Sequence, residues 1–411
     1  MDRLSLYDMV GRLMAEILTE WLSPGAVETH TYTYLFCDLR TDTVLAELPL
    51  RGVKHSTELN GIGALSAVVP YTADTFPLDP DTATRPGRTA VYVDRDGVIM
   101  WGGIIWARDR AEGGKQIQAA EFLSYYQRRF VKKTLSTDPS VLLDARYVPD
   151  GQKLYPDQRF IVWSLLRYAE TQVGGNVGID ILSMVPDPNT GVFPTVTYFG
   201  YERPAIYDCI VALAKADNGF DFGIDVRWTQ PGNNEPPRRV REMKVWYPRR
   251  GRQSAAESGL YFSSGGPEPS ILSYTWPENG TELSTEVSAL GAGNGEAKLV
   301  SVQQAADLIA AGYPLIEAVT TYSDVVEQAR LDATARADLA ARTQADVQPS
   351  FEVMADADPA YGSYSVGDVA RFVIAPDEQT PAGRSAELRI LSIEATPGAG
   401  AERITLKCGA V

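Results

Sequence analysis

The stretch Thr89-Ala-Val-Tyr-Val-Asp94, Arg95-Asp96-Gly97, Val98-Ile-Met-Trp-Gly-Gly-Ile-Ile-Trp106 decides the fold class. Its two outer parts are rich in β-branched and aromatic residues, which favour strands. The Asp96-Gly97 dipeptide between them is typical of a tight hairpin turn. The stretch therefore predicts two antiparallel strands, and the Gly102-Gly103 pair predicts a bulge or bend in the second strand.

The same pattern surrounds this hairpin from Thr31 to about Trp106. Short apolar runs alternate with turn residues, and Asp42 and Asn60-Gly61 mark two further hairpins. A succession of short strands joined by such turns predicts an antiparallel β domain. We place this domain over residues 25–135.

Two helices are predicted to flank this domain. Apolar residues recur at helical spacing from Leu4 to Leu22, so we expect an amphipathic helix over residues 1–24. This helix either packs on its own domain or docks against another subunit. A second, short helix is predicted over Glu121 to Val131, and the residues of its apolar face are Phe122, Tyr126 and Phe130.

A mixed segment over residues 136–200 is predicted to be an α/β connector domain. Pro156-Asp157 is typical of a helix N-terminus, and Gly174-Gly175 ends the helical pattern. Thr197 to Phe199 is predicted to be a short strand.

Residues 201–411 are predicted to form a second β domain. Its first element is a helix from Pro204 to Asn218, because proline favours the first helical turn and Asn-Gly a left-handed stop. A hairpin follows, and later strands alternate apolar and polar residues. The predicted strands are Phe220 to Trp228, Glu242 to Tyr247, Val366 to Ile374, Glu387 to Glu394 and Arg403 to Cys408.

Helical segments interrupt this second domain near residues 302–345. Helices are predicted from Val302 to Ala311 and from Ser323 to Ala345, and the second is rich in alanine. We expect the second helix to pack closely against a neighbouring surface through its small side chains, namely Val326, Ala329, Ala333 and Ala340. The whole chain is therefore predicted to be an α+β multidomain protein, mainly of antiparallel sheets.

Composition limits the function classes. The 411 residues include 38 basic and 53 acidic side chains, and the net charge of −15 makes nucleic acid a poor surface partner. Charged residues interrupt the first 22 positions, so we expect no secretory signal. The most apolar stretch elsewhere, Val98 to Ala107, is far shorter than the roughly 20 residues of a membrane-spanning helix, so we expect no membrane anchoring.

Residues for catalysis or metal binding are scarce. Cys37, Cys209 and Cys408 lie far apart, and His30 and His55 are the two histidines of the chain. This set predicts no zinc ribbon, no disulfide framework and no histidine-rich site. The Asp79-x-Asp81 spacing lacks the other positions of a calcium loop, and Gly291 to Gly295 lacks a phosphate-binding pattern and is predicted to be a mobile linker. We expect no catalytic residue, no cofactor and no metal.

One dense basic run stands out on this acidic chain. The residues predicted to bind a partner are Arg238, Arg239, Arg241, Trp246, Arg249 and Arg250. Arginines interleaved with aromatic residues are also typical of nucleic-acid binding. The alternative is a hairpin whose arginines face solvent or an acidic partner, and the neighbouring prolines favour an exposed loop tip.

Four groups of stretches occur in a definite order from about residue 30 to the end. They are Tyr34-Leu-Phe-Cys-Asp-Leu-Arg40 with Leu59-Asn-Gly-Ile-Gly63 and Val69-Pro70; Arg85-Pro-Gly-Arg-Thr-Ala-Val-Tyr-Val-Asp94 with Trp101-Gly-Gly-Ile-Ile-Trp106; Gly291 to Gly295 with Gly312-Tyr-Pro-Leu315 and the alanine-rich helix; and Tyr364-Ser-Val-Gly-Asp368 with Arg389-Ile-Leu-Ser-Ile393 and Arg403-Ile-Thr-Leu406. In this order they resemble the tail hub proteins, or minor tail proteins, of long-tailed, siphovirus-type bacteriophages.

The resemblance implies a structural, non-enzymatic protein of the virion tail tip, made in the host cytoplasm. It implies two tube-like domains of β-barrel or sandwich type per chain, joined by helical connectors, and a homotrimer that adapts a six-fold tail tube to a three-fold tip. The implied partners are the distal tail protein, the tape-measure protein and other minor tail or receptor-binding proteins, with DNA only in transit through the lumen.

Two other function classes remain open from the residues. The 53 carboxylates offer many pairs that could cleave glycosidic bonds, which leaves a tail-associated cell-wall or glycan hydrolase as the alternative. A monomeric glycan-binding module is the third class.

Overall fold

The computed structural model describes residues 30–72, 74–75, 78–137, 157–182, 191–216, 218–230, 236–323, 325–343, 346–378, 380–398 and 402–411. The chain divides into two compact units. The first unit comprises Met1–Leu272, Glu352–Leu406 and Val411, and the second comprises Ser273–Phe351 and Lys407–Ala410. The helix predicted over residues 1–24 lies outside the described residues.

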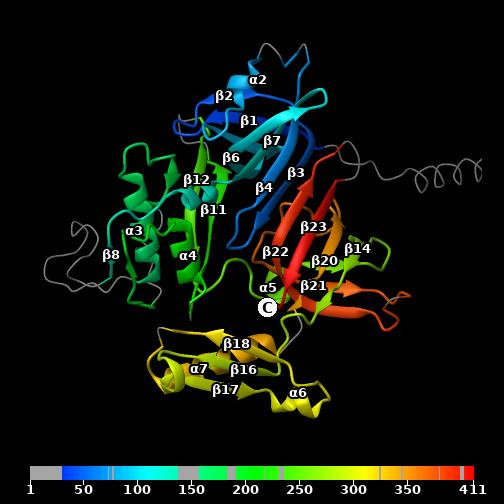
Figure 1. Cartoon of the computed structure of the whole chain (residues 1–411). Helices are drawn as coiled ribbons and strands as arrows, with labels where there is room; N and C mark the ends of the chain where they lie inside the picture. The colour runs from blue at the N-terminus through cyan, green and yellow to red at the C-terminus, as the bar shows by residue number, and fades with distance from the viewer. Residues whose placement is uncertain are drawn as a thin grey trace, which may run out of the picture. The chain divides into compact units, whose positions relative to one another are not determined.

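The first unit begins with an antiparallel sheet that we call β module 1 (Figure 1). The order of its strands is β3-β4-β7-β6-β5-β1-β2. A short helix, α2 (Pro80–Ala83), lies between β4 and β5 in the chain. The strands of the module are β1 (Tyr32–Asp38), β2 (Val44–Glu47), β3 (Arg51–Glu58), β4 (Ala64–Pro70), β5 (Thr89–Arg95), β6 (Val98–Ala111) and β7 (Gly114–Glu121).

Strand β5 is buried on both faces, which explains its nearly continuous run of apolar residues. Val91 and Val93 face a core inside β module 1. Ala90 and Tyr92 face a second core, which the module shares with the helices that follow. The strand is thus sandwiched between two apolar layers.

The three predicted hairpin turns are confirmed. Strands β1 and β2, β3 and β4, and β5 and β6 pair antiparallel. Asp42, Asn60 and Asp96 have φ values of 56°, 55° and 53° in these turns. Asn and Asp tolerate this left-handed region better than most residues.

The predicted bulge lies beside the glycine pair rather than in it. The register between β5 and β6 shifts from Val93↔Trp101 to Asp94↔Ile99. Gly103 serves close packing instead, because a Cβ there would lie 2.3 Å from the carbonyl oxygen of Ala120 on β7.

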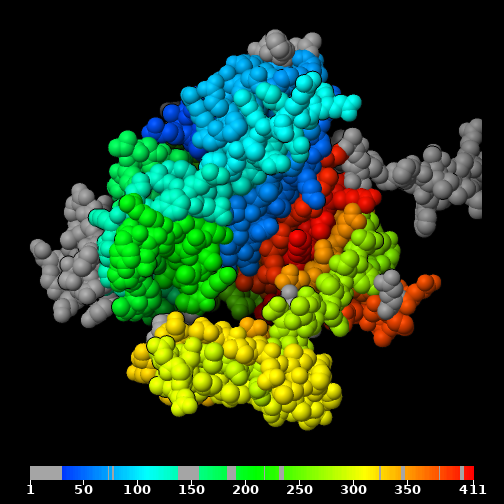
Figure 2. Space-filling view, viewed as in Figure 1, coloured from blue at the N-terminus to red at the C-terminus, as the bar shows by residue number. Residues whose placement is uncertain are grey.

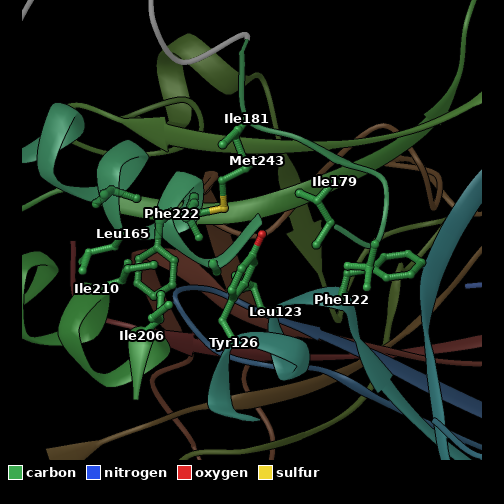
Figure 3. Packing of buried hydrophobic residues seen from close by; sticks show 14 of the residues in the cluster. Phe122, Leu123, Tyr126, Leu165, Ile179, Ile181, Ile206, Ile210, Phe222 and Met243 are labelled. Carbon is green, nitrogen blue, oxygen red and sulfur yellow. The ribbon is translucent and has the colours of Figure 1, made fainter. Parts of the chain in front are cut away.

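A group of elements that we call the connector packs against β module 1 (Figure 3). Figure 3 shows apolar side chains of its helices and strands converging on one core. The predicted cap is confirmed, since the Asp157 carboxylate accepts a hydrogen bond of 2.8 Å from the Phe160 N–H. The elements of the connector are η2 (Phe122–Arg128), β8 (Leu135–Ser136), α3 (Gln158–Glu170), β9 (Ile179–Asp180), β10 (Thr197–Tyr198), α4 (Ile206–Ala214), β11 (Asp221–Trp228) and β12 (Arg239–Trp246).

The helix predicted over Glu121 to Val131 is the shorter 3₁₀ helix η2. Phe122 and Tyr126 are buried as predicted, whereas 41% of Phe130 is exposed. The chain has already left the helix at Phe130, where it makes an isolated bridge with Ala205.

The first unit also contains a second sheet region, which we call β module 2. It consists of β13, β21 and β22 with the parts of β20 and β23 that belong to this unit. Its core includes Phe262 and Phe372, whose stacked rings have centroids 5.0 Å apart. The three predicted C-terminal strands are confirmed. The elements of this region are α5 (Ala255–Ser258), β13 (Tyr261–Ser263), β20 (Ser350–Met354), β21 (Val369–Ile374), β22 (Arg384–Thr396) and β23 (Arg403–Gly409). Strand β14 (Ile271–Thr275) begins in the first unit and ends in the second.

The second unit is built on a three-stranded sheet of order β17-β16-β18. Helix α7 packs on it through one stripe, and the buried residues of that stripe are Leu331, Ala335 and Leu339. The elements of the unit are β15 (Glu278–Asn279), β16 (Glu286–Leu290), η5 (Gly295–Ala297), β17 (Val300–Gln304), α6 (Ala306–Ala310), β18 (Glu317–Thr321), α7 (Gln328–Arg342) and β19 (Asp346–Val347).

Three expectations for this region are wrong in detail. Val302, the predicted start of a helix, lies in strand β17. The predicted alanine stripe of α7 is exposed, because the leucines of the opposite stripe bury more apolar area. The glycine-rich stretch Gly291 to Gly295 is a turn held by backbone hydrogen bonds, in which Ala292 donates to Val325 and Leu299 donates to Ala292.

No helix in the described part of the chain is long and apolar enough to cross a membrane.

Candidate functional site

Strands β3 and β22 join the two β modules into one sheet. Their antiparallel register places Ser392 opposite Glu58 and Ala395 opposite His55. Across the junction, Lys54 Nζ lies 2.9 Å from Glu394 Oε1. Figure 2 shows the surface of β3 and β4, in blue, continuing into the surface of β22, in red. The two modules therefore present one uninterrupted strand surface.

The arginines of the β11–β12 hairpin divide into an internal and an exposed group. Arg238 and Arg249 are exposed. Arg241 is buried, Arg239 pairs with Asp42, and Arg250 pairs with Asp225 and stacks on the Trp246 ring. The six residues predicted to bind a partner thus lie in the β11–β12 hairpin or just after β12, but they do not form one surface patch. Partner binding by these residues stays a prediction.

Arg241 ties the hairpin to β module 1. Only 2% of its side chain is exposed. Its guanidinium donates hydrogen bonds of 2.7 Å to the Leu39 carbonyl, 2.6 Å to the Val177 carbonyl and 2.6 Å to Asp42 Oδ1. Nε donates a fourth, of 2.6 Å, to the Tyr92 hydroxyl. The buried charge is therefore compensated by one carboxylate and three neutral oxygens.

A second buried ion pair links all three parts of the first unit. Asp221 of β11 pairs with Arg389 of β22. The same carboxylate accepts hydrogen bonds of 2.7 Å from Asn60 Nδ2, in the β3–β4 turn, and of 2.6 Å from the Arg250 N–H. Module 1, the connector and module 2 thus meet at one carboxylate.

Sequence analysis did not find these two ion pairs. For Arg241 a signal exists, since Arg241 alternates with the apolar residues Met243 and Val245, which places the three side chains on one face of a strand. Asp221 and Arg389 are each flanked by large apolar residues in a strand, which is unusual for charged side chains. Neither signal identifies the partner.

Glu121, at the end of β7, carries a perturbed carboxyl group. The Thr57 hydroxyl donates to it at 2.9 Å and the Gly63 N–H donates at 2.7 Å. Burial nevertheless raises the pKa of the Glu121 carboxyl to about 7. The folded state therefore retains a proton that the unfolded chain has already released near neutral pH.

Replacing Glu121 with glutamine is expected to change how stability depends on pH. Because the folded-state pKa is raised, the carboxyl favours folding at low pH, and this contribution is lost as the pH rises through about 7. The free energy of unfolding should fall between about pH 5 and about pH 8 by on the order of 2 kcal/mol more in the native chain than in Glu121→Gln. Urea unfolding at both pH values measures this difference.

The control for this experiment is Glu112→Gln, in the exposed β6–β7 turn. It should keep the native pH dependence. Equal pH dependence of Glu121→Gln and the native chain would contradict the prediction.

The cysteines offer no activated nucleophile. Cys37, Cys209 and Cys408 are free and buried. Burial raises the pKa of the Cys37 and Cys209 thiols to about 11 and that of Cys408 still further. A buried thiol with a raised pKa stays protonated and reacts poorly. Burial also lowers the pKa of His55 to about 4, so this imidazole is neutral near pH 7.

One group of side chains in the described part of the chain has the spacing of metal ligands. It consists of His30, Asp356 and Glu402, whose ligand atoms lie within 4.8 Å of one another. The Arg95 guanidinium already pairs with Glu402 at 2.9 Å and with Asp356 at 3.4 Å. The arginine thus supplies the positive charge that a metal ion would bring, and the group does not fit a cation.

Solved structures share this architecture. The tail protein from Neisseria meningitidis MC58 is 12% identical, with a TM-score of 0.51, and the match covers 92% of this chain and 96% of that one. The 43 kDa tail protein of prophage MuSo2 from Shewanella oneidensis is 10% identical, with a TM-score of 0.52, over 92% and 98% of the two chains. The chain has the fold of phage tail proteins.

The likeness to these tail proteins lies in structure rather than in sequence. No protein-family model and no curated protein matches the chain. The tail-protein fold extends over both units, because more than nine-tenths of this chain is covered in each match.

Proposed function

We propose that the chain is a structural subunit of a phage tail, of which three copies form a hub at the tail tip. The observation that carries this proposal is the union of two β modules in one sheet, within a tail-protein fold. Three chains with two tube-like modules each would present six modules to a six-fold tube. In this proposal the two tube-like domains are those expected over residues 25–135, which hold β module 1, and over 201–411, which hold β module 2. The connector domain expected over 136–200 separates them, and the connector elements described above extend beyond these bounds on both sides.

The buried ion pairs support this role. A symmetry adaptor must keep its two modules together, and the β3–β22 pairing, Arg241 and Asp221 join the parts of the first unit at three separate places. Removing one partner of a pair buried on both sides, such as Asp221–Arg389, costs about 3–5 kcal/mol, so this contact resists rearrangement.

The hub would bind the distal tail protein and the tape-measure protein and would anchor receptor-binding or other minor tail proteins. DNA would pass through its lumen, and the net charge of −15 disfavours adsorption of phosphate. The protein would be made in the host cytoplasm and reside at the tail tip of the virion. The buried, protonated thiols and the neutral His55 support a non-enzymatic role.

Native mass spectrometry of the purified chain tests the proposal. The expected particle has three times the chain mass of 44.9 kDa. Light scattering at several concentrations supplies an independent mass. A six-membered ring would contradict the proposed symmetry, and a chain that stays monomeric at all concentrations would contradict self-assembly into a hub.

A further inference from the structure

His30 lies between two carboxylates that belong to different β modules. Its Nδ1 is 2.6 Å from Asp96 Oδ2, and its Nε2 is 2.7 Å from Asp356 Oδ1. Asp96 forms the β5–β6 turn of β module 1, and Asp356 follows β20 beside β module 2. The imidazole therefore bridges the modules at a place separate from the β3–β22 pairing.

The two short contacts favour the charged form of the ring. An ionised carboxylate only accepts hydrogen bonds, and a neutral imidazole has a single N–H donor. Asp96 is held ionised, since the Thr31 N–H, at 2.8 Å, and His30 itself keep the pKa of its carboxyl below the usual range. Asp356 also pairs with the Arg95 guanidinium at 3.4 Å. Both ring nitrogens thus face carboxylate oxygens, and only the imidazolium form of His30 can donate to both.

The other charged groups around His30 act in both directions. Arg95 opposes a second positive charge, but Glu402 and Asp356 largely neutralise Arg95. The hydrogen bonds to Asp96 and Asp356 outweigh both Arg95 and desolvation, so the pKa of His30 is raised from its ordinary value. The titratable and charged groups of this cluster are Asp96, Asp356, Arg95, Glu402, Tyr32, whose hydroxyl donates to Glu402, and Tyr361, whose ring lies against Arg95.

We propose that His30 is a proton-dependent clasp that, as an imidazolium ion, holds β module 1 to β module 2, and that releases this contact when it loses its proton. A neutral ring can donate to only one of the two carboxylates, so deprotonation breaks one arm of the bridge. The modules then stay joined by the remaining contacts but gain freedom in their relative orientation. This inference concerns the single chain and does not depend on how many copies assemble.

The sign of the pH dependence follows from the raised pKa. The clasp contributes fully to stability at pH values below the ordinary histidine pKa of about 6.5, and its contribution is lost as the pH rises through the pKa of folded His30. The relative orientation of the modules should therefore become less defined on the alkaline side.

Nuclear magnetic resonance of the imidazole groups tests the first half of the proposal. The chain has two histidines, so a histidine-labelled sample gives two titrations. His30 should titrate above about 6.5 and His55 far below it, near the value of about 4 that burial produces. Asp356→Asn and Asp96→Asn should each lower the pKa of His30. Titration of His30 at or below the ordinary value would overturn the proposal.

Distances between two spin labels test the second half. Glu112 in β module 1 and Ala382 next to β22 are exposed, and the native cysteines are buried, so Glu112→Cys and Ala382→Cys can be labelled selectively. The distance distribution should be narrow below the pKa of His30 and broad above it, with the same midpoint as the imidazole titration.

Two variants of His30 complete the design. His30→Gln carries no charge and should give the broad distribution at every pH. His30→Lys keeps a positive charge up to its ordinary pKa of about 10.4 and should give the narrow distribution throughout the range. The proposal would be overturned if the width of the spin-label distance distribution did not change with pH. It would also be overturned if His30→Gln gave a distribution as narrow as that of the native chain.

Discussion

Replacing Arg241 with methionine is expected to lower the free energy of unfolding by about 2–6 kcal/mol, because two buried carbonyl oxygens lose their donors. Methionine keeps much of the length of the side chain but donates no hydrogen bond. The carbonyl oxygens of Leu39 and Val177 would lose their 2.7 Å and 2.6 Å donors, and Asp42 would lose one of its two arginine partners. Buried acceptors without donors cost about 1–3 kcal/mol each, so the losses accumulate. Urea unfolding, followed by tryptophan fluorescence, measures the change.

Arg249→Met is the matched control. Arg249 belongs to the same basic run but is exposed just beyond β12. Its replacement should change the free energy of unfolding by less than about 0.5 kcal/mol. If both variants lost a similar free energy of unfolding, Arg241 would not stabilise the contact between the hairpin and β module 1 as described above.

Asp221→Ala is expected to produce a loss of similar size, about 3–5 kcal/mol. The change leaves the buried Arg389 guanidinium without its carboxylate and removes the acceptor of Asn60 Nδ2 and of the Arg250 N–H. Since this carboxylate joins both modules and the connector, the loss should also increase hydrogen exchange in the β3–β22 pairing. Denaturant unfolding and hydrogen exchange measure the two effects.

Strand β11 offers its own control. Asp225 also pairs with arginine, at 2.9 Å from Arg250, but its side chain is 29% exposed. Asp225→Ala should therefore cost only about 0–1 kcal/mol. The double variant Asp221→Ala/Arg389→Met should recover part of the loss, because it removes the unpaired buried charge. A double variant less stable than Asp221→Ala would contradict this account.

Much of β module 1 could be predicted from the sequence because its hairpins are local. Asp96-Gly97 adopts its turn within a few residues of the strands that it joins, and Asp157 caps a helix through a residue three positions later. The sequence pattern predicts a helix at Val302, which lies in a strand, because a short apolar run does not distinguish helix from strand. Val302 belongs to a strand because it pairs with Ser288 of β16, and Ser288 lies outside that apolar run.

The candidate site was predicted less well than the fold. A dense run of arginines is typical of a binding surface, yet Arg239, Arg241 and Arg250 are engaged by carboxylates of the same chain. Composition does not reveal which face of a strand will be covered. Burial of Arg241 follows from β module 1 packing on that face of the hairpin.

The amino-acid sequence by itself determined the strands, the turns and the helix caps, since these depend on interactions among residues a few positions apart. Only the tertiary structure decided which charges meet. Asp42 and Arg241 are 199 positions apart, and Asp221 and Arg389 are 168 apart. Pairs so remote in the chain depend on how whole strands pack, because a buried charge is stable only where packing brings its counter-charge within hydrogen-bond distance.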